Sequence, residues 1–530
     1  MGARFRRVRR AAQVGRVARR AHVLRVLREV GVFGDRPATP ESAREFRLAL
    51  EELGTSWIKL GQLLSSRSDL LPDVYIEELE RLVDDVPAVP FAAIREVVAG
   101  ELGPDAFVEL DEEPLATASI AQIHRAILKD GREVVVKVRR PGIAEQVALD
   151  LEVMRSAAGM AEKRSGTAQL LQLGPLAEEL ESHLRAELDL VEEASNTETI
   201  ARLVEDVEEL TVPRVIRPYV TERVLVLERI QGGKVEAGHG LPPERARRLA
   251  REFFRAYVRQ VTVEGIYHAD PHRGNVLLTE DGRLALLDFG LLGRLDDDTR
   301  RKLGLLLIAV AENRADDVAA LLLSMSLTTV ESDQPSFVHD VRRKLPRYHW
   351  RPLSAIRAGE ALTDLQRIAL RHGIRLPTSF ALVGKTLSQA DTIARTLDPE
   401  LDPIALLEED ALEVMLGEAE RRLEPQRLLS ELFIQLEPLV RMPRRLGHLA
   451  ERFEEGTLKI GVAPTDLRGL DGVVRSAANR IGAALIVVGL LVSSALISRV
   501  YEWVALVGFV LGAAIGLYML WKIIRTPGEL

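Results

Sequence analysis

Residues 268–290 of the 530-residue chain read HADPHRGNVLLTEDGRLALLDFG and contain the strongest local signal in the sequence. Two short apolar runs flank an Asp-Gly turn, which predicts a pair of strands with polar residues at their ends. Asp270 and Asn275 lie five residues apart, and Asp288 follows thirteen residues later. Phosphoryl-transfer enzymes use this order for a carboxylate that orients the attacking oxygen and for two oxygen ligands of Mg²⁺. The spacing therefore predicts a phosphoryl-transfer site.

The same stretch allows a second interpretation, in which His268 and His272 bind a metal ion. Pro271 lies between them and disfavours the helix that would place both imidazoles on one face. No third histidine and no cysteine lies near them in the sequence. We therefore favour the phosphoryl-transfer interpretation over a histidine metal site.

Residues 118–138 contain an apolar run, an Asp-Gly turn and the run EVVVKV, a pattern that predicts a β-hairpin. Lys137 lies among valines on the returning strand, and its ammonium group needs an anion once that strand is buried. The small residues at 116–119 would allow a phosphate chain to approach backbone N–H groups. Taken alone, Lys137 could also be an edge-strand lysine that reaches water.

Two further segments carry polar residues at helical spacing. Apolar side chains in residues 44–66 recur as on an amphipathic helix, and Lys59 and Gln62 lie side by side on it. Gly61 costs about 1 kcal/mol relative to alanine inside a helix, so we expect a backbone or a ligand to approach closely there. Residues 187–193 form part of an acidic helix whose carboxylates can point in two directions. Composition alone favours the simpler interpretation that they form a solvated helix face.

The composition restricts the classes of protein that the chain can represent. Its 47% hydrophobic and 28% charged residues are typical of a folded chain, and at about 150 residues per domain its length predicts two to four structural units. The absence of cysteine excludes a disulfide scaffold, a thiol nucleophile, a zinc ribbon and an iron–sulfur cluster. The net charge of −8 argues against a general nucleic-acid binder.

Charge is distributed unevenly along the chain. The first thirty residues contain ten arginines and one glutamate, so they carry +9 and leave −17 for the remainder. Apolar residues at helical spacing predict that this arm forms a basic amphipathic helix. We expect the arm to lie on anionic headgroups, and the alternative is a solvated basic helix.

The C-terminal region contains two charge-free stretches of 18 residues, 481–498 and 504–521. Each is long enough to predict a transmembrane helix, and flanking Arg and Lys residues predict that both chain ends lie in the cytoplasm. The glycines at 508, 512 and 516 would pack the second helix against the first or against another copy. We therefore expect a two-pass protein of the cell inner membrane, with a hairpin buried inside a soluble domain as the alternative.

Several motifs together resemble one known family. Residues 59–62 (KLGQ) resemble its KxGQ motif, residues 116–124 (ATASIAQIH) its alanine-rich loop, and residues 187–189 (ELD) its ExD motif. On these motifs, over residues 44–403 and the tail hairpin, the chain resembles the UbiB-type (aarF) atypical protein-kinase-like family, which is associated with isoprenoid quinone biosynthesis. Thr117 stands where alanine is common in the loop, and this leaves the nucleotide preference open.

The resemblance implies an α+β fold: a two-lobed protein-kinase-like domain with an N-terminal helical extension over the active site and a C-terminal transmembrane helical hairpin. The predicted segments are the basic arm (1–40), the helical extension with the KxGQ motif (41–110), the N-lobe (111–232), the C-lobe (233–450), a linker (451–479) and two transmembrane helices (480–525).

The resemblance also assigns roles to individual residues. Lys137 would hold the nucleotide phosphates and pair with Glu193, Asp270 would be the catalytic aspartate, and Asn275 and Asp288 would hold Mg²⁺. The implied cofactors are ATP or ADP and Mg²⁺. The nucleotide-binding residues would be Ala116, Thr117, Ala118, Ser119, Lys137 and Glu228, and the regulatory residues Lys59, Gln62, Glu187 and Asp189.

The function implied by these assignments is that of a membrane-anchored atypical kinase or ATPase. It would bind and hydrolyse ATP with Mg²⁺, or transfer a phosphoryl group, in support of ubiquinone-type biosynthesis or lipid handling. The expected partners are membrane lipid, isoprenoid quinone precursors, quinone-biosynthesis enzymes and, through the hairpin, a second copy, but no nucleic acid. The alternatives are a non-catalytic ATP-binding membrane scaffold for those enzymes and an ordinary protein kinase, which the extension would obstruct.

Overall fold

The computed structural model describes most of the first 407 residues and short pieces of the remainder. The described residues are 2–22, 25–26, 29, 37–65, 71–82, 86–164, 173–326, 332–346, 358–407, 409, 503, 506–507, 509–511 and 513–515. The chain divides into two compact units, Met1–Arg427 and Leu428–Leu530. The fold and the site described below belong to the first unit.

The N-terminal extension is helical. Thr39 begins one of its helices by accepting a hydrogen bond from the Ser42 N–H, and Gly54, at φ +92°, ends that helix and allows the next to start at once. The helices are α1 (Gly2–Arg20), α3 (Pro40–Leu53), α4 (Thr55–Ser65) and α5 (Asp73–Leu79).

The N-lobe is built on a five-stranded antiparallel sheet of order β1-β3-β4-β6, with β2 paired to β3. The predicted hairpin is confirmed, because β3 and β4 pair from Ala121↔Arg139 to Ile127↔Glu133. The strands are β1 (Glu109–Leu110), β2 (Ala116–Thr117), β3 (Ala121–Ile127), β4 (Glu133–Arg139) and β6 (Val224–Glu228).

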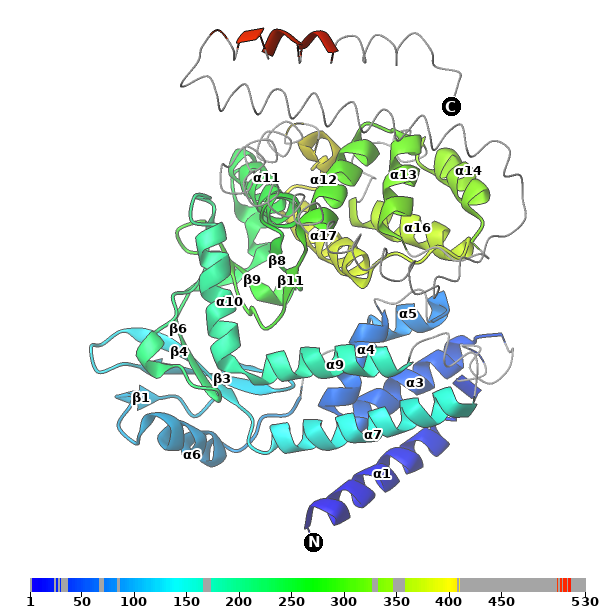
Figure 1. Cartoon of the computed structure of the whole chain (residues 1–530). Helices are drawn as coiled ribbons and strands as arrows, with labels where there is room; N and C mark the ends of the chain where they lie inside the picture. The colour runs from blue at the N-terminus through cyan, green and yellow to red at the C-terminus, as the bar shows by residue number, and fades with distance from the viewer. Residues whose placement is uncertain are drawn as a thin grey trace. The chain divides into compact units, whose positions relative to one another are not determined.

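Helices cover this sheet and connect it to the extension. Ile94 and Val97 of α6 are buried in one core cluster with valines of β4 and β6, so α6 covers one face of the sheet. Figure 1 shows α7 and α9 running beside the extension helices α3 and α4. The helices are α6 (Phe91–Leu102), α7 (Ile143–Arg164), α9 (Leu173–Leu188) and α10 (Leu190–Leu203).

The C-lobe contains the largest core cluster, which joins its helices to a four-stranded sheet of order β5-β10-β9-β7 and to the pair β11-β8. Its strands are β5 (Leu210–Thr211), β7 (Gly232–Lys234), β8 (Ile266–His268), β9 (Val276–Thr279), β10 (Leu284–Leu286) and β11 (Leu292–Arg294). Its helices are α11 (Pro243–Arg259), α12 (Asp297–Ala311), α13 (Ala315–Met325), α14 (Gln334–Lys344), α16 (Ala358–Arg371) and α17 (Thr378–Leu397). Short helical turns are η1 (Arg217–Tyr219), η2 (Val235–Gly240), η3 (Gln260–Glu264) and η4 (Arg273–Asn275).

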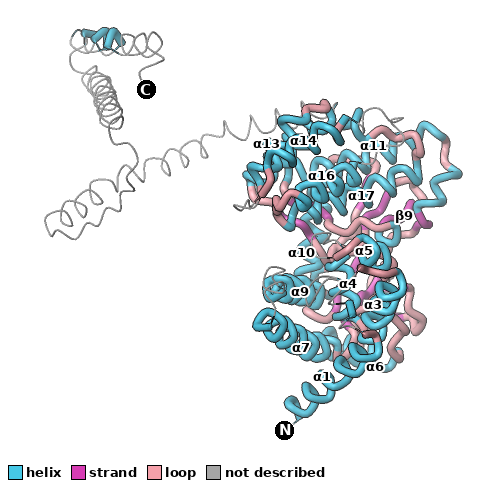
Figure 2. Tube along the Cα trace, turned by 90° about the vertical axis from the view of Figure 1, so that its right-hand side faces the viewer, coloured by secondary structure: helices cyan, strands magenta, loops and turns pink. Residues whose placement is uncertain are grey.

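The extension also reaches the C-lobe. Figures 1 and 2 show α5 between the other extension helices and the C-lobe helices α16 and α17. Arg367 of α16 forms an ion pair with Asp73 at the start of α5, with 3.6 Å between Nη2 and Oδ1. The extension therefore contacts both lobes.

The basic arm forms the predicted helix, α1, and packs on the protein itself. Nε of Arg10 lies 2.6 Å from the buried Oδ1 of Asp150 on α7, and Arg10 also donates to the carbonyl of Leu53. Arg7 pairs with Glu152 at 3.1 Å. Part of the charge of the arm is thus used to hold α1 against α7 and α3.

The expected C-terminal transmembrane hairpin and the two-pass inner-membrane location are corrected by the structure. Among the described residues, no helix has both the length and the apolar character needed to cross a bilayer. The longest described helices, α1, α7 and α17, all carry charged side chains along their length. Residues 481–498 lie outside the described residues, and 504–521 are described only in short pieces. The fold class that stands is the α+β kinase-like fold.

Candidate functional site

The centre of the candidate site is a cluster of three charged side chains from three separate elements. Lys137 on β4 places Nζ 2.6 Å from Oε1 of Glu193 on α10 and 3.3 Å from Oδ1 of Asp288, which follows β10. The side chains of Lys137 and Glu193 are only 11% and 4% exposed. We expected the ammonium group of Lys137 to need an anion, and the structure gives it two carboxylate partners. The alternative of an edge-strand lysine is wrong, because β4 lies between β3 and β6.

The electrostatics of the cluster follow from this arrangement. Burial alone lowers the pKa of Lys137, but the carboxylates of Asp288 and Glu193 raise it above its ordinary value. Burial raises the pKa of Glu193, although Lys137 acts in the opposite direction. Loss of water contact raises the pKa of Asp288, whereas Lys137, the Gly290 N–H and Lys59 lower it to about 2. Asp288 is therefore ionised at neutral pH and Lys137 is protonated.

The backbone at Asp288 fixes the direction of its carboxylate. Its φ of +56° lies in the left-handed region, which a non-glycine residue adopts at a cost of about 1 kcal/mol or more. The Gly290 N–H donates to Asp288 Oδ1 at 3.3 Å. Phe289 is buried, and its carbonyl accepts a hydrogen bond from Asn196 Nδ2 at 3.1 Å. These contacts hold the turn that presents Asp288 to Lys137.

Asp270 is held by two side chains that the sequence interpretation missed. Its Oδ1 accepts from Nε2 of Gln389 at 3.0 Å and lies 3.1 Å from Nζ of Lys385, both on α17. Loss of water contact raises the pKa of Asp270, but Lys385 and Gln389 lower it below its ordinary value. Lys385 and Gln389 are four residues apart, so they share one face of a helix, and this spacing was the available signal.

Asn275 joins this group through the backbone. It ends the turn η4, and its Nδ2 donates to the carbonyl of Asp270 at 3.4 Å. Its main-chain carbonyl accepts from the N–H of Leu287, the residue before Asp288, at 2.8 Å. Asn275 therefore links the loop of Asp270 to the loop of Asp288.

The KxGQ helix α4 contributes a further charge. Lys59 Nζ lies 3.0 Å from Oε1 of Glu187, at the C-terminal end of α9, and the two side chains are 20% and 22% exposed. The pKa of Asp288 also responds to Lys59, so this ammonium lies near the Lys137 cluster. A Cβ placed on Gly290 would lie 3.9 Å from Cγ of Glu187. The Lys59–Glu187 pair therefore borders the Asp288 turn.

Two other residues of these motifs have structural contacts. The Asp189 side chain accepts from the Val191 N–H at 2.9 Å and so caps α10, the helix that carries Glu193. The Gln62 carbonyl accepts from Ser65 Oγ at 2.8 Å. The expected close approach at Gly61 is made by side chains rather than by a backbone or ligand, because a Cβ there would lie 2.8 Å from Leu50 and closer still to Leu82.

The alanine-rich loop is tied to the extension. Ala116 and Thr117 form β2, the Ala118 N–H donates to the Ala121 carbonyl at 2.9 Å, and Ser119 is buried. The Ser119 carbonyl accepts from Oγ1 of Thr55, the first residue of α4, at 3.1 Å.

Glu228 lies apart from this loop, at the end of β6. Its Oε2 accepts from Nε of Arg214 at 3.0 Å, and this hydrogen bond is the main cause of its lowered pKa. In the structure the Glu228 carboxylate therefore binds Arg214 and not the Lys137 cluster.

The oxygen donors of Asp288 and Asn275 are of the type that fits Mg²⁺ together with a nucleotide. Within the described residues, no group of three or more His, Asp or Glu side chains could hold a metal ion. Asp288 and Asn275 offer two hard oxygen donors, and Mg²⁺ commonly takes one or two protein carboxylates and completes its shell with water and phosphate oxygens. The histidine alternative is not favoured, because buried His268 packs 5.0 Å from the Phe289 ring while His272 Nδ1 accepts from the Gly274 N–H.

Comparisons with known proteins found similarities over most of the chain. Residues 81–322 match the ABC1 atypical kinase-like domain, 341–402 the UbiB helical domain, and 465–525 the ABC1/UbiB kinase-like C-terminal domain. The chain is 33% identical to a "Probable protein kinase UbiB" of Xanthomonas campestris pv. campestris, over 87% of this chain and 86% of that protein. It is 29% identical to an "Uncharacterized protein in hydrogenase 1 5'region" of Clostridium pasteurianum, over 92% and 94% of the two chains. A solved structure, the complex of Rv3197 with erythromycin from Mycobacterium tuberculosis, is 24% identical with a TM-score of 0.47, over 70% of this chain and 95% of that one.

Proposed function

The chain belongs to the UbiB-type family of ABC1 atypical kinase-like proteins, and from this premise we propose that it binds Mg²⁺–ATP beside Lys137 and hydrolyses it or transfers its γ-phosphoryl group. Family membership supports a role in ubiquinone biosynthesis. The observation that carries the catalytic proposal is the contact of Lys137 with both Glu193 and Asp288. A kinase-like site needs this lysine fixed by a helix glutamate and facing the metal-binding aspartate.

In this proposal each residue of the site has its own role. Lys137 supplies a fixed positive charge to the nucleotide phosphates, and Glu193 holds it in place. Asp288 and Asn275 would hold Mg²⁺, which when bound neutralises charge on the β- and γ-phosphates. Asp270 orients the attacking oxygen, and Lys385 and Gln389 restrain its carboxylate at 3.1 and 3.0 Å. Positioning and electrostatic stabilisation therefore account for the proposed rate enhancement.

The acceptor in this proposal is water or a small or lipidic molecule. The helix α4 lies against the Asp288 turn through the Lys59–Glu187 ion pair, and α5 is joined to the C-lobe through Asp73 and Arg367. A folded protein substrate would have to displace this extension. We infer that the physiological substrates are isoprenoid quinone precursors or other lipids, acted on in association with quinone-biosynthesis enzymes.

A single-turnover measurement of phosphate release tests the catalytic proposal. The full chain is mixed with Mg²⁺–ATP, and wild type is compared with Asp270→Asn and with Asp105→Asn, a control at an exposed aspartate outside the site. We expect release from wild type and the control, and a decrease of about 100-fold or more in Asp270→Asn. ATP binding without release in wild type would support the scaffold alternative instead.

A genetic experiment tests the biological part. A deletion strain is expected to lose ubiquinone-type product and to accumulate precursor, and the Asp105→Asn gene but not the Asp270→Asn gene should restore both. Unchanged quinone and precursor levels in the deletion strain would contradict the proposed role. Rescue by Asp270→Asn would show that the role needs no catalysis.

A further inference from the structure

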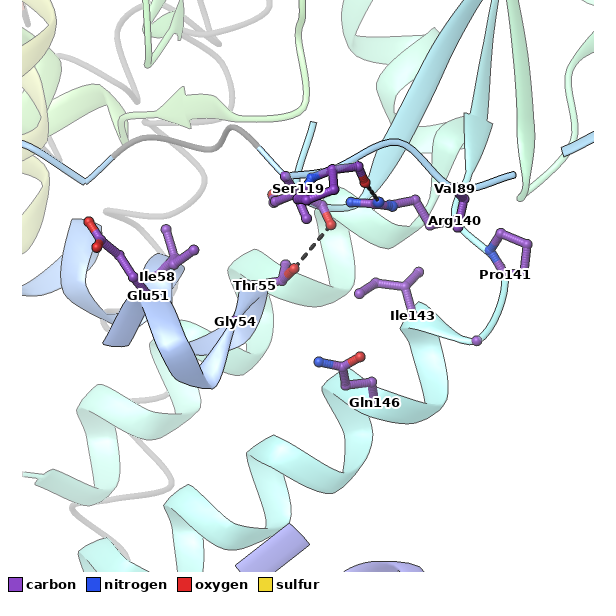
Figure 3. Close-up of a pocket in the computed structure, with 13 residues that line it drawn as sticks. Glu51, Gly54, Thr55, Ile58, Val89, Ser119, Arg140, Pro141, Ile143 and Gln146 are labelled. Atoms are coloured by element: carbon purple, nitrogen blue, oxygen red, sulfur yellow. Dashed lines mark hydrogen bonds between the residues drawn. The ribbon is translucent and has the colours of Figure 1, made fainter. Parts of the chain in front are cut away.

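A cavity of about 640 Å³ lies where the helical extension meets the N-lobe (Figure 3). Its walls come from four places in the sequence: the α3–α4 junction, residues 86–89, the alanine-rich loop at Ser119, and the turn between β4 and α7. Lys137, Asp270 and Asp288 do not line it. The cavity is therefore distinct from the cluster at which nucleotide binding is proposed, although Ser119 touches it.

Arg140 supplies the positive charge of this cavity. Its guanidinium donates to two main-chain carbonyls, Ala118 at 3.4 Å and Pro87, and no carboxylate among the described residues forms an ion pair with it. Burial lowers the pKa of Arg140, and no acidic group opposes this effect. A guanidinium has five N–H donors, so Arg140 keeps donors for a ligand. Lys137, three residues earlier, has two carboxylate partners instead.

Among the described residues, the other polar groups at the wall add no acidic side chain without a basic partner. Glu51 lines the cavity, but its Oε1 pairs with Arg47 Nη1 at 2.5 Å. Two helices begin at the wall, α4 at Thr55 and α7 at Ile143, and the N-terminal end of a helix favours negative charge. Gln146 on α7 adds an exposed amide. These features supplement the charge of Arg140.

The remaining wall is apolar. Ile58, Val86, Val89 and Ile143 line the cavity together with prolines of the two loops. Figure 3 shows Thr55 on α4 opposite Ile143 on α7, with Arg140 above Ile143 and Ile58 farther along α4. A volume of about 640 Å³ lies within the range of sites that bind small molecules. An occupant would thus combine a small apolar body with an anionic head group.

We propose that this cavity binds a small organic carboxylate, with its carboxylate on Arg140 and its apolar body between Ile58 and Val89. The planar fork of a guanidinium matches the two oxygens of a carboxylate, which favours this head group over a neutral one. Such a ligand would contact both α4 and the alanine-rich loop, which the Thr55–Ser119 hydrogen bond already joins. The proposal stands on the cavity itself and does not depend on nucleotide turnover.

Binding of benzoate to the full chain, measured by isothermal titration calorimetry, tests the proposal, with benzamide as the neutral compound of the same shape. We expect saturable benzoate binding and at least about tenfold weaker binding of benzamide, because hydrogen bonds to a charged carboxylate are stronger than those to a neutral amide. Arg140→Gln should weaken benzoate binding by a similar factor. Equal binding of the two compounds, or no saturable binding of benzoate, would overturn the proposal.

A second pair of variants separates loss of the site from loss of folding. Gln146→Glu leaves the hydrogen bonds of Arg140 intact and places a repelling carboxylate at the wall, so benzoate binding should fall several-fold. Ala148→Glu adds the same charge at an exposed position of α7 that does not line the cavity, and binding should stay unchanged. Unchanged binding in Gln146→Glu would overturn the proposal, as would competition between benzoate and Mg²⁺–ATP, which would place benzoate at the Lys137 cluster.

Discussion

The Lys137–Glu193 and Lys59–Glu187 ion pairs both border Asp288, but they differ in depth and in origin. Lys137 and Glu193 come from the kinase-like lobe and are 11% and 4% exposed, whereas Lys59 comes from the extension and is 20% exposed beside a glutamate that is 22% exposed. Removing one partner of a buried pair leaves an uncompensated charge, whereas a shallower pair contributes little net free energy. The buried pair is therefore part of the fold and of the proposed chemistry, and the shallower pair can open at low cost.

The largest effect is expected from breaking the buried pair. Lys137→Met removes the proposed phosphate-binding charge and leaves Glu193 beside Asp288, so phosphate release should fall by about 100-fold or more. The free energy of unfolding should fall by about 3 kcal/mol, because a carboxylate is left buried without its partner. Single-turnover assays and urea unfolding measure the two quantities. Lys129→Met, at an exposed lysine of the β3–β4 turn, should change neither; a similar loss in this control would contradict the distinction.

An intermediate effect is expected at the positioning residue Lys385. Lys385→Ala should lower the rate of phosphate release by about tenfold, a change of about 1.4 kcal/mol, with little change in ATP affinity. The loss is partial because Gln389 still donates to Asp270. A matched control is Lys344→Ala, since Lys344 is also 38% exposed and also lies 3.1 Å from an aspartate, Asp364. Equal rates in the two variants would show that Lys385 does not position Asp270.

The smallest effect on stability is expected from the shallower pair. Lys59→Ala should change the free energy of unfolding by less than about 1 kcal/mol. Because the charge of Lys59 lowers the pKa of Asp288, its removal should make Asp288 a stronger cation ligand and lower the Mg²⁺ concentration for half-maximal turnover several-fold. Lys302→Ala breaks an ion pair with Asp298 at similar exposure of the lysine and should leave the Mg²⁺ requirement unchanged. A higher Mg²⁺ requirement in Lys59→Ala would contradict this account.

Local patterns allowed much of the site to be predicted. The Asp270, Asn275 and Asp288 spacing follows from short strands and turns that are continuous in sequence, and β9 and β10 form as expected. Lys137 could be assigned because a buried lysine requires an anion, although its partners lie 56 and 151 residues away. A lysine on an apolar strand therefore predicts a contact with an acidic residue, although the sequence does not show which residue it is.

Contacts that depend on the packing of distant elements could not be predicted. Lys385 and Gln389 reach Asp270 only because α17 packs against α11 and β11, and Thr386 of α17 donates a hydrogen bond to the carbonyl of Ala269. Asp189 carried no pattern that separated a helix cap from a site residue. The prediction of a transmembrane hairpin is corrected, because no helix among the described residues could cross a bilayer.

The central claim is that Lys137, Asn275 and Asp288 surround one magnesium-bound nucleotide. The most direct measurement is the ATP affinity of the full chain by calorimetric titration, with and without Mg²⁺, in wild type and in Asp288→Asn. Wild type should bind ATP at least about tenfold more tightly with Mg²⁺, a difference of about 1.4 kcal/mol or more, and Asp288→Asn should lose this dependence. An equal effect of Mg²⁺ in both proteins, or no ATP binding by wild type, would contradict the account.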